Sequence, residues 1–411
     1  MFHGWRVVAA CFVIATVAWA LGTFGASVYL QAVTAAHGWP IADVAFAITL
    51  FYLVSALVQR AVGRGIDRWG PRPVLLLGTV SMALGVAAIG QVAARWQLYP
   101  CFVLIGLGWA TLSTTGIAAT VAPWFERHQG RSMTLAIMGA SVGAIVGVPV
   151  LQLAIRQLGL AHGLAVVGAV AAAALLPLIA HVLRFRRPEE IGLQRDGGTS
   201  LAEPIPGPVS RPIATPANRP LLLWSAAIAF ALGLAMQIGF ITHHVTLAEP
   251  LLGTAGAGLL VSATGGSALV GRLILARIAD GVAVRRLACW VMVAQAAALL
   301  ALALWPDVPV LVMASLVYGY GIGHITTLGP IVVRREFGAA AFGATYGAAA
   351  SVIQLTSAFG PAVFGVLRDG FGGYRPGLAI ASVVTLTACL ILFTGGRLAA
   401  QSRQGAGHGR H

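Results

Sequence analysis

The ionisable side chains of Arg272 and His324 lie inside long apolar runs of the sequence. An arginine at the centre of a membrane-spanning helix costs about 2.5 to 3.5 kcal/mol on insertion scales, so such a residue is a functional candidate by default. A guanidinium stays charged and can hold a carboxylate through two parallel hydrogen bonds. Histidine titrates near neutral pH and can carry a proton. The chemistry that these two residues could perform is therefore anion binding and proton exchange.

Each of the two residues also has a plain structural interpretation. Arg272 could lie low in its helix and extend its side chain to the membrane interface, or pair with groups near Asp280. His324 could be a hydrogen-bonded packing residue. Both interpretations remain open at the level of the sequence.

The acidic residues define what the protein does not bind. None of the twelve lies clearly in the middle of an apolar run, so an organic cation would find no buried counter-charge, and an anionic or neutral ligand is favoured. All 26 basic residues are arginine, which excludes chemistry based on a lysine Schiff base. The four cysteines show neither metal-ligand spacing nor a disulfide framework. We therefore expect no cofactor and no metal.

The elements that must position these residues are membrane-spanning helices. The chain of 411 residues is 58% hydrophobic and only 9% charged, with a mean hydropathy of +0.87, and a soluble protein has about 25% charged residues. About 20 apolar residues cross a hydrocarbon core about 30 Å thick. Twelve such runs are predicted, near 7–30, 41–62, 73–94, 97–121, 130–154, 162–183, 221–246, 255–276, 287–305, 309–332, 340–366 and 376–396. The fold class is therefore an all-α polytopic membrane protein.

The arginines give the orientation of these spans. With the N-terminus in the cytoplasm, 21 of the 26 fall on the cytoplasmic side, four fall on the other face, and Arg272 alone lies inside a span. This bias follows the positive-inside rule and predicts that both termini are cytoplasmic, in an inner membrane. The net charge of +14 therefore describes topology, and nucleic-acid binding is not expected.

A repeat divides the chain into two halves. Residues 184–219 are rich in proline and predict a flexible cytoplasmic linker. Asp67 and Arg72 follow the second span, and Asp280 and Arg285 follow the eighth at a constant separation of 213 residues. We expect a six-helix bundle at 1–183, the linker at 184–219, a second six-helix bundle at 220–398 and a cytoplasmic tail at 399–411. Two bundles in the same orientation are the architecture of alternating access around a central cavity.

The loop after the second span resembles the signature loop of the major facilitator superfamily. The residues that carry the resemblance are Gly63, Asp67, Arg68, Gly70 and Arg72, with a weaker copy at Arg277 and Asp280. The resemblance covers essentially the whole chain and implies twelve helices in two pseudo-symmetric six-helix bundles. It also implies that this loop is a conformational latch, in which Asp67 pairs with arginines and backbone amides and releases them when the cavity opens inward. The alternative is that the arginines only fix topology.

Three further stretches resemble the monocarboxylate porters and the bacterial oxalate:formate-antiporter-like group. They begin at Gly4, at Pro123 and at Arg187. The resemblance implies that Arg272 pairs with the substrate carboxylate. Two positions depart from it, because an acid that many members place four residues before this arginine is Ala268 here, and a lysine late in the first span is replaced near Thr23. Proton coupling would therefore use another group, and His324 is the best placed.

The lining of the cavity is expected from the identity of the spans, because spans 1, 4, 7 and 10 line it in this superfamily. The predicted substrate-binding residues, besides Arg272, are Thr23, Trp109, Ser113, Thr114 and Tyr318, together with Tyr346 from span 11. Most aromatic residues in such a set are packing residues. Gly139, Gly143 and Gly147 predict close helix contacts, because no strand precedes them and a dinucleotide loop is excluded.

These features predict a secondary transporter, and not an enzyme, for a small organic anion, with a monocarboxylate as the leading candidate. Transport would be by proton symport or by anion exchange. The expected partners are the anion, protons and the lipid bilayer, and the expected oligomeric state is a monomer. The alternative is efflux of an amphipathic or drug-like compound. A membrane enzyme would need a cluster of catalytic groups, for which only His243 and His244 give a hint, and a channel is disfavoured by the duplicated halves.

Overall fold

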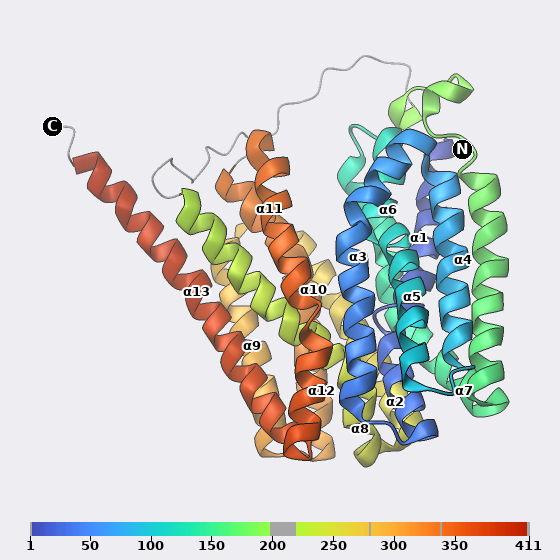
Figure 1. Cartoon of the computed structure of the whole chain (residues 1–411). Coiled ribbons are helices and arrows are strands. Elements are labelled where there is room, and N and C mark those ends of the chain that lie inside the picture. The colour runs from blue at the N-terminus through green and yellow to red at the C-terminus, as the bar shows by residue number, and fades with distance from the viewer. Residues whose placement is uncertain (1, 198–218, 279–280, 338, 409–411) are drawn as a thin grey trace. The chain divides into compact units, whose positions relative to one another are not determined.

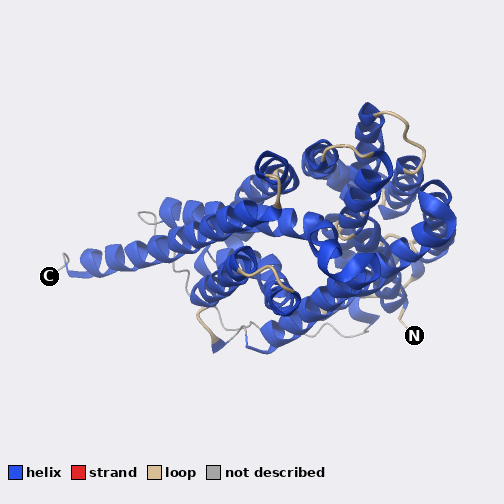
Figure 2. Ribbon diagram, turned by 90° about the horizontal axis from the view of Figure 1, so that it is seen from below, coloured by secondary structure: helices blue, strands red, loops and turns tan. Residues whose placement is uncertain are grey.

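The computed structural model of the chain describes residues 2–197, 219–278, 281–337 and 339–408. Within these ranges the ordered elements are helices joined by short loops, and no strand occurs (Figures 1 and 2). The all-helical class predicted from composition is therefore confirmed for the part of the chain that the structure describes.

The helices follow the apolar runs of the sequence. The α-helices are α1 (His3–Leu21), α2 (Gly25–His37), α3 (Ile41–Trp69), α4 (Pro71–Ile89), α5 (Leu98–Leu112), α6 (Thr114–Val121), α7 (Gln129–Val182), α8 (Arg219–Ile278), α9 (Val284–Leu304), α10 (Val308–Phe337), α11 (Ala339–Ser357), α12 (Gly360–Phe371) and α13 (Tyr374–His408). Short 3-10 turns lie at Arg95–Gln97, Ala122–Trp124, Pro188–Ile191 and Arg195–Gly197.

Ten helical segments of the described chain are long and apolar enough to cross a membrane. Two of them are much longer than one crossing needs, because α7 has 54 residues and α8 has 60, or roughly 80 to 90 Å at 1.5 Å per residue. Each is interrupted by one glycine with a left-handed backbone, Gly159 (φ 78°) in α7 and Gly253 (φ 67°) in α8. Glycine adopts this conformation without the steric penalty of a Cβ. Both long helices are thus two helical stretches joined at a glycine.

Other apolar runs that the sequence presents as continuous are broken near their middle. The first run ends one helix at Leu21 and begins the next at Gly25. The fourth is interrupted at Ser113, which has an extended backbone (φ −86°, ψ −163°) between α5 and α6. The eleventh is interrupted between Ser357 and Gly360. Backbone that leaves the helix at membrane depth is tolerated where protein or a cavity surrounds it.

The chain forms two compact units. The first contains Met1–Ile205 and Ile241–Gly265, and the second contains Pro206–Phe240 and Gly266–His411. In the first unit α1 packs along α7, and α4 packs against α5 and α7. In the second, α9 packs against α10 and α13 around a core that includes Phe230, Met292 and Leu328.

The contact between α1 and α7 confirms the predicted role of the glycines in α7. Gly139 and Gly143 face the backbone carbonyls of Phe12 and Thr16, and Gly147 faces Ala20. A side chain at any of these glycines would push the helices apart, as expected where small residues let helix backbones approach closely.

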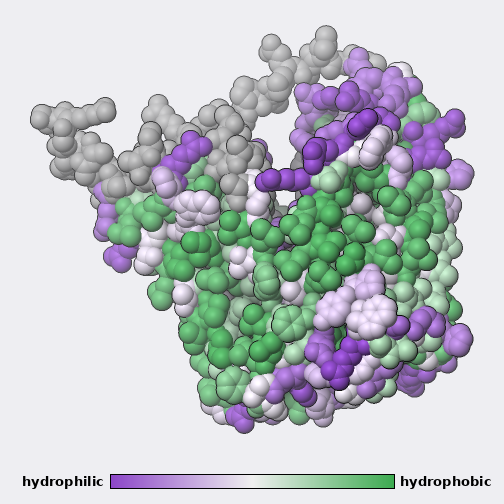
Figure 3. Space-filling view, in the orientation of Figure 1, coloured by the Kyte–Doolittle hydropathy of each residue, from purple (hydrophilic) through white to green (hydrophobic). Residues whose placement is uncertain are grey.

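The molecular surface agrees with insertion in lipid. In Figure 3 hydrophobic side chains cover the middle of the helices, and hydrophilic side chains gather toward their ends. Large apolar residues are exposed on the lateral surfaces of the helices, for example Leu77 and Leu259. Trp69, Trp96 and Trp305 are more than half exposed near helix ends, the position at which tryptophan meets the membrane interface.

Candidate functional site

The strongest candidate site in the second unit is the place where α8 crosses α10. Two glycines permit the crossing. A Cβ at Gly323 of α10 would collide with the carbonyl oxygen of Ala268 and lie 2.9 Å from the backbone nitrogen of Arg272. A Cβ at Gly271 of α8 would collide with the carbonyl oxygen of Tyr320 and lie 3.1 Å from Nδ1 of His324. The two helix backbones therefore approach at the residues that carry Arg272 and His324.

His324 is completely buried at this crossing. Its Nδ1 lies 3.0 Å from the backbone carbonyl oxygen of Tyr320, and because a carbonyl only accepts hydrogen bonds, Nδ1 carries the proton and donates it. The Tyr320 ring lies 4.5 Å away between centroids. The other ring nitrogen, Nε2, is buried and has no hydrogen-bond partner in the described structure. In the neutral ring Nε2 therefore presents a lone pair that can accept a proton or a donor group.

Arg272 lies one residue after Gly271 and is partly buried. The structure therefore brings the backbone of Arg272 against the turn of α10 that carries His324. Gly323 sits directly against the Ala268 carbonyl, so the two helix backbones are in contact at this turn of α8. A guanidinium can bind an anion and an imidazole can exchange a proton, so residues of this crossing carry both kinds of group.

The two tyrosines predicted for this unit have different outcomes. Tyr318 is only 1% exposed, its ring packs on Phe240 with centroids 4.4 Å apart, and its carbonyl accepts a weak hydrogen bond from Gln295 at 3.4 Å. It lies in the packed interior of the unit. Tyr346 belongs to α11, and its side chain lies outside the described residues.

The first unit places its predicted residues at breaks in two neighbouring helices. Thr23 lies in the turn between α1 and α2, and Ser113 lies at the break between α5 and α6. The two breaks are linked by aromatic contact, because Trp19 and Trp109 meet edge to face with ring centroids 4.7 Å apart. Discontinuous helices supply backbone polar groups inside a membrane protein and mark binding sites in transporters. Thr114, next to the second break, is exposed.

Sequence reasoning missed Tyr52 of α3. Its side chain is buried, and its hydroxyl interacts with the Thr23 side chain at the turn between α1 and α2. Two neighbouring hydroxyl groups at a helix break can both donate and accept hydrogen bonds, as binding of a polar ligand requires. The only signal in the sequence was a hydroxyl inside an apolar run, and this is too common to select one residue.

The loop predicted to be a latch is held within its own unit. Gly70 joins α3 to α4 with a left-handed backbone (φ 86°), and the Arg186 side chain fills the space where a Cβ would lie. Arg186 donates hydrogen bonds to the carbonyl oxygens of Trp69 and, at 3.5 Å, of Arg68. The remaining members of the predicted latch are Gly63, which has open space around it, Asp67, Arg72 and Arg277, which are exposed, and Asp280, which lies outside the described residues. The latch stays a prediction.

A second polar contact ties the chain after α7 back to the start of that helix. The Asp196 carboxylate accepts hydrogen bonds from the backbone N–H groups of Glu126, Arg127 and His128 at 3.0, 2.8 and 3.2 Å, and lies 3.3 Å from the His128 ring. Partial burial opposes ionisation, but the backbone donors and the His128 ring outweigh it and hold the Asp196 pKa below its usual value.

Helical segments long and apolar enough to cross a membrane, with helix breaks at Thr23 and Ser113, are the architecture of a polytopic membrane transporter. Residues 10–253 match the sequence profile of the Major Facilitator Superfamily, and the chain belongs to this family.

Comparison with known proteins agrees with this assignment. The chain is 26% identical to Monocarboxylate transporter 13 of Bos taurus over 405 residues, which cover 95% of this chain and 89% of that protein. It is 34% identical to Multidrug resistance protein MdtH of Klebsiella pneumoniae (strain 342), but only over 27% of each chain. The crystal structure of the nucleoside transporter NupG has the same fold, with a TM-score of 0.73, 13% identity, and coverage of 96% of this chain and 99% of that one.

Proposed function

We propose that the protein is a secondary active transporter that moves a small organic anion, with a monocarboxylate as the leading candidate, by alternating access. In this proposal the chain has twelve membrane crossings in two pseudo-symmetric six-helix bundles. It works as a monomer in an inner membrane, with both termini in the cytoplasm.

The number of crossings in the proposal comes from the helix breaks. The ten apolar segments include the two long helices α7 and α8, and Gly159 and Gly253 divide each of these into two stretches. Counting each stretch as one crossing gives twelve. The arginine bias toward one side supports the orientation.

The observation that carries the choice of an anion is the crossing of α8 and α10. There the backbone of Arg272 lies against Gly323, the residue before His324, whose Nε2 is buried without a hydrogen-bond partner among the described residues. The similarity to Monocarboxylate transporter 13 over nearly the whole chain supports the same class of cargo. In this proposal Arg272 holds the carboxylate, and His324 exchanges the proton if transport is symport. Anion exchange needs only Arg272.

Counterflow in proteoliposomes tests the proposal. Purified protein is reconstituted into vesicles, and the vesicles are preloaded with one unlabelled small monocarboxylate. Uptake of a labelled monocarboxylate is then measured for the parent, for Arg272→Ala and for Arg156→Ala. Arg156→Ala is the matched control, because it removes an exposed arginine of α7. Two charge-assisted hydrogen bonds are worth about 3 kcal/mol, so Arg272→Ala should lower uptake on the order of 100-fold.

The control should transport like the parent. If Arg272→Ala is folded and transports monocarboxylates normally, the assignment of Arg272 is wrong. If the parent transports none of a panel of small carboxylates at acid or neutral pH, the anion proposal is wrong.

The second candidate is efflux of an amphipathic compound, which the similarity to MdtH over 111 residues favours. In that case a lipophilic compound would be transported, and small carboxylates would not compete with it. Competition in the same vesicles therefore distinguishes the two candidates.

A further inference from the structure

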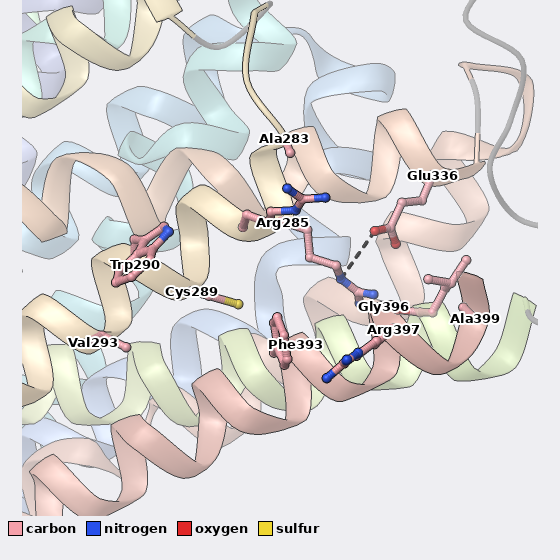
Figure 4. A pocket seen from close by; sticks show the side chains of 12 residues that line it. Ala283, Arg285, Cys289, Trp290, Val293, Glu336, Phe393, Gly396, Arg397 and Ala399 are labelled. Atoms are coloured by element: carbon pink, nitrogen blue, oxygen red, sulfur yellow. Dashed lines mark hydrogen bonds and ion pairs between the residues drawn. The ribbon is translucent and has the colours of Figure 1, made fainter. Parts of the chain in front are cut away.

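A cavity of about 890 Å³ lies at one end of the second unit, away from the crossing of α8 and α10. Its wall comes mainly from α9 and α13, with Glu336 from α10 and Leu222 from the start of α8 (Figure 4). The arginine bias predicts that this end of the helices faces the cytoplasm.

The cavity carries an excess of positive charge. Three arginines line it, Arg285, Arg286 and Arg397, against one acid, Glu336. Arg285 is paired with neighbouring side chains. Its Nε lies 3.3 Å from the Glu336 carboxylate, and its Nη2 donates a hydrogen bond to the Ser225 hydroxyl at 2.8 Å. Its Nη1 is buried without a hydrogen-bond partner in the described structure.

The other two arginines are exposed at the rim, and the guanidinium of Arg397 lies 5.9 Å from the centre of the Phe393 ring. An anion at this rim would meet two exposed arginine side chains. A phosphate group matches this arrangement, because guanidinium groups bind phosphate oxygens through paired hydrogen bonds.

The apolar part of the wall continues along the lateral surface of both helices. On α9 the exposed residues Trp290, Val293 and Leu300 follow Arg286 at helical spacing, and on α13 the residues Val383, Leu386, Leu390 and Phe393 lead to Arg397 at the same spacing. Since α9 and α13 pack against each other, two exposed apolar stripes each end on an arginine at the same end of the unit.

A water-soluble anion would gain nothing from these stripes. An acyl chain would bury about 25 cal/mol per Å² along them. We propose that this cavity binds an anionic phospholipid of the cytoplasmic leaflet, with its phosphate between Arg286 and Arg397 and its acyl chains along Trp290, Phe393 and the stripes of α9 and α13.

Native mass spectrometry of the full-length protein tests this proposal. The protein, released from delipidating detergent, is titrated with phosphatidylglycerol, with phosphatidylcholine of the same acyl chains, or with inorganic phosphate. The variants are Arg286→Gln, Arg397→Gln and the double variant. The matched control is Arg127→Gln/Arg334→Gln, which removes the same charge from exposed sites outside the cavity.

We expect phosphatidylglycerol to bind more tightly than phosphatidylcholine. Each arginine near an anionic membrane surface contributes about 1 kcal/mol, so each single variant should weaken phosphatidylglycerol binding about fivefold and the double variant about 25-fold, while the control should change little. Trp290→Ser should weaken binding of both phospholipids, because it removes part of the acyl-chain wall.

Equal binding of phosphatidylglycerol by the parent and the double variant would overturn the proposal. A loss of phosphatidylglycerol binding in the control variant as large as that in the double variant would overturn it as well. If inorganic phosphate displaces phosphatidylglycerol, and Trp290→Ser has no effect on phospholipid binding, the cavity binds a soluble anion. This result would equally overturn the proposal. Since the single variants replace exposed side chains, they keep the test informative if the double variant does not fold.

Discussion

Gly323 should be the most sensitive small residue of α10. In Gly323→Ala the new methyl group would collide with the carbonyl oxygen of Ala268 and lie 2.9 Å from the backbone nitrogen of Arg272. Both obstacles are backbone atoms of α8, so no side chain can rotate away and the helices must separate. Overpacking of this kind costs about 1 to 3 kcal/mol.

The same helix offers a matched control. Gly329 is also buried in α10, but a Cβ there would meet only the Phe230 ring at 3.7 to 3.9 Å, which is ordinary van der Waals contact. Replacing glycine by alanine favours a helix by up to about 1 kcal/mol, and this gain is common to both variants. The difference between the two variants therefore measures the collision alone.

Thermal unfolding followed by tryptophan fluorescence, and counterflow with equal amounts of folded protein, check this prediction. At about 2 to 4 °C per kcal/mol for a unit of this size, Gly323→Ala should melt several degrees below Gly329→Ala. It should also transport less per folded molecule, since separation of the helices moves Arg272 away from His324. If Gly323→Ala melts with Gly329→Ala and transports like the parent, the crossing is not the tight contact on which the site depends.

Three further predictions concern single residues. In a proton symporter, His324→Gln should flatten the pH dependence of uptake, and a flux profile identical to that of the parent would remove this histidine from coupling. Because the pKa of Asp196 is lowered in the folded protein, the stability it contributes is present above its unfolded pKa, near 3.9, and is lost as the pH falls through the folded value. Asp196→Ala should therefore lower the free energy of unfolding at neutral pH by about 1 kcal/mol, seen as a lower melting temperature, and should have less effect in strong acid. An equal loss of stability at both pH values would contradict an ionised carboxylate. Gly70→Ala should destabilise the protein by about 1 to 2 kcal/mol, because residue 70 has a left-handed backbone. The control is Gly130→Ala, where a Cβ meets open space. Equal melting temperatures of the two variants would show that Arg186 is not held against residue 70.

The apolar runs predicted the helices well because a spanning helix needs only a continuous run of about 20 apolar residues. The same signal could not find the breaks. Ser113 lies among Thr111, Thr114, Thr115 and Gly116, which are weak helix formers, but propensity alone does not say at which of these residues the backbone becomes extended. The close helix contact at Gly139, Gly143 and Gly147 could be predicted, because a four-residue spacing places these glycines on one face of α7.

Arg272 and His324 were readable as individual residues, because an ionisable group in an apolar run is rare. Their proximity was not readable, because it depends on the crossing of α8 and α10 at Gly271 and Gly323. The role of Tyr318 as a lining residue stays a prediction. The structure adds that its ring packs against Phe240 in the interior, a contact that the sequence could not give because packing sets the face that a residue takes within a helix bundle.

The energetics of the crossing argue that it serves more than packing. The buried Nε2 of His324 has no hydrogen-bond partner among the described residues, which costs about 1 to 3 kcal/mol. Two glycines alone would hold α8 and α10 together with apolar neighbours at no such cost. A ligand that donates a hydrogen bond to Nε2 would recover this free energy, and a protonated small carboxylic acid can donate one.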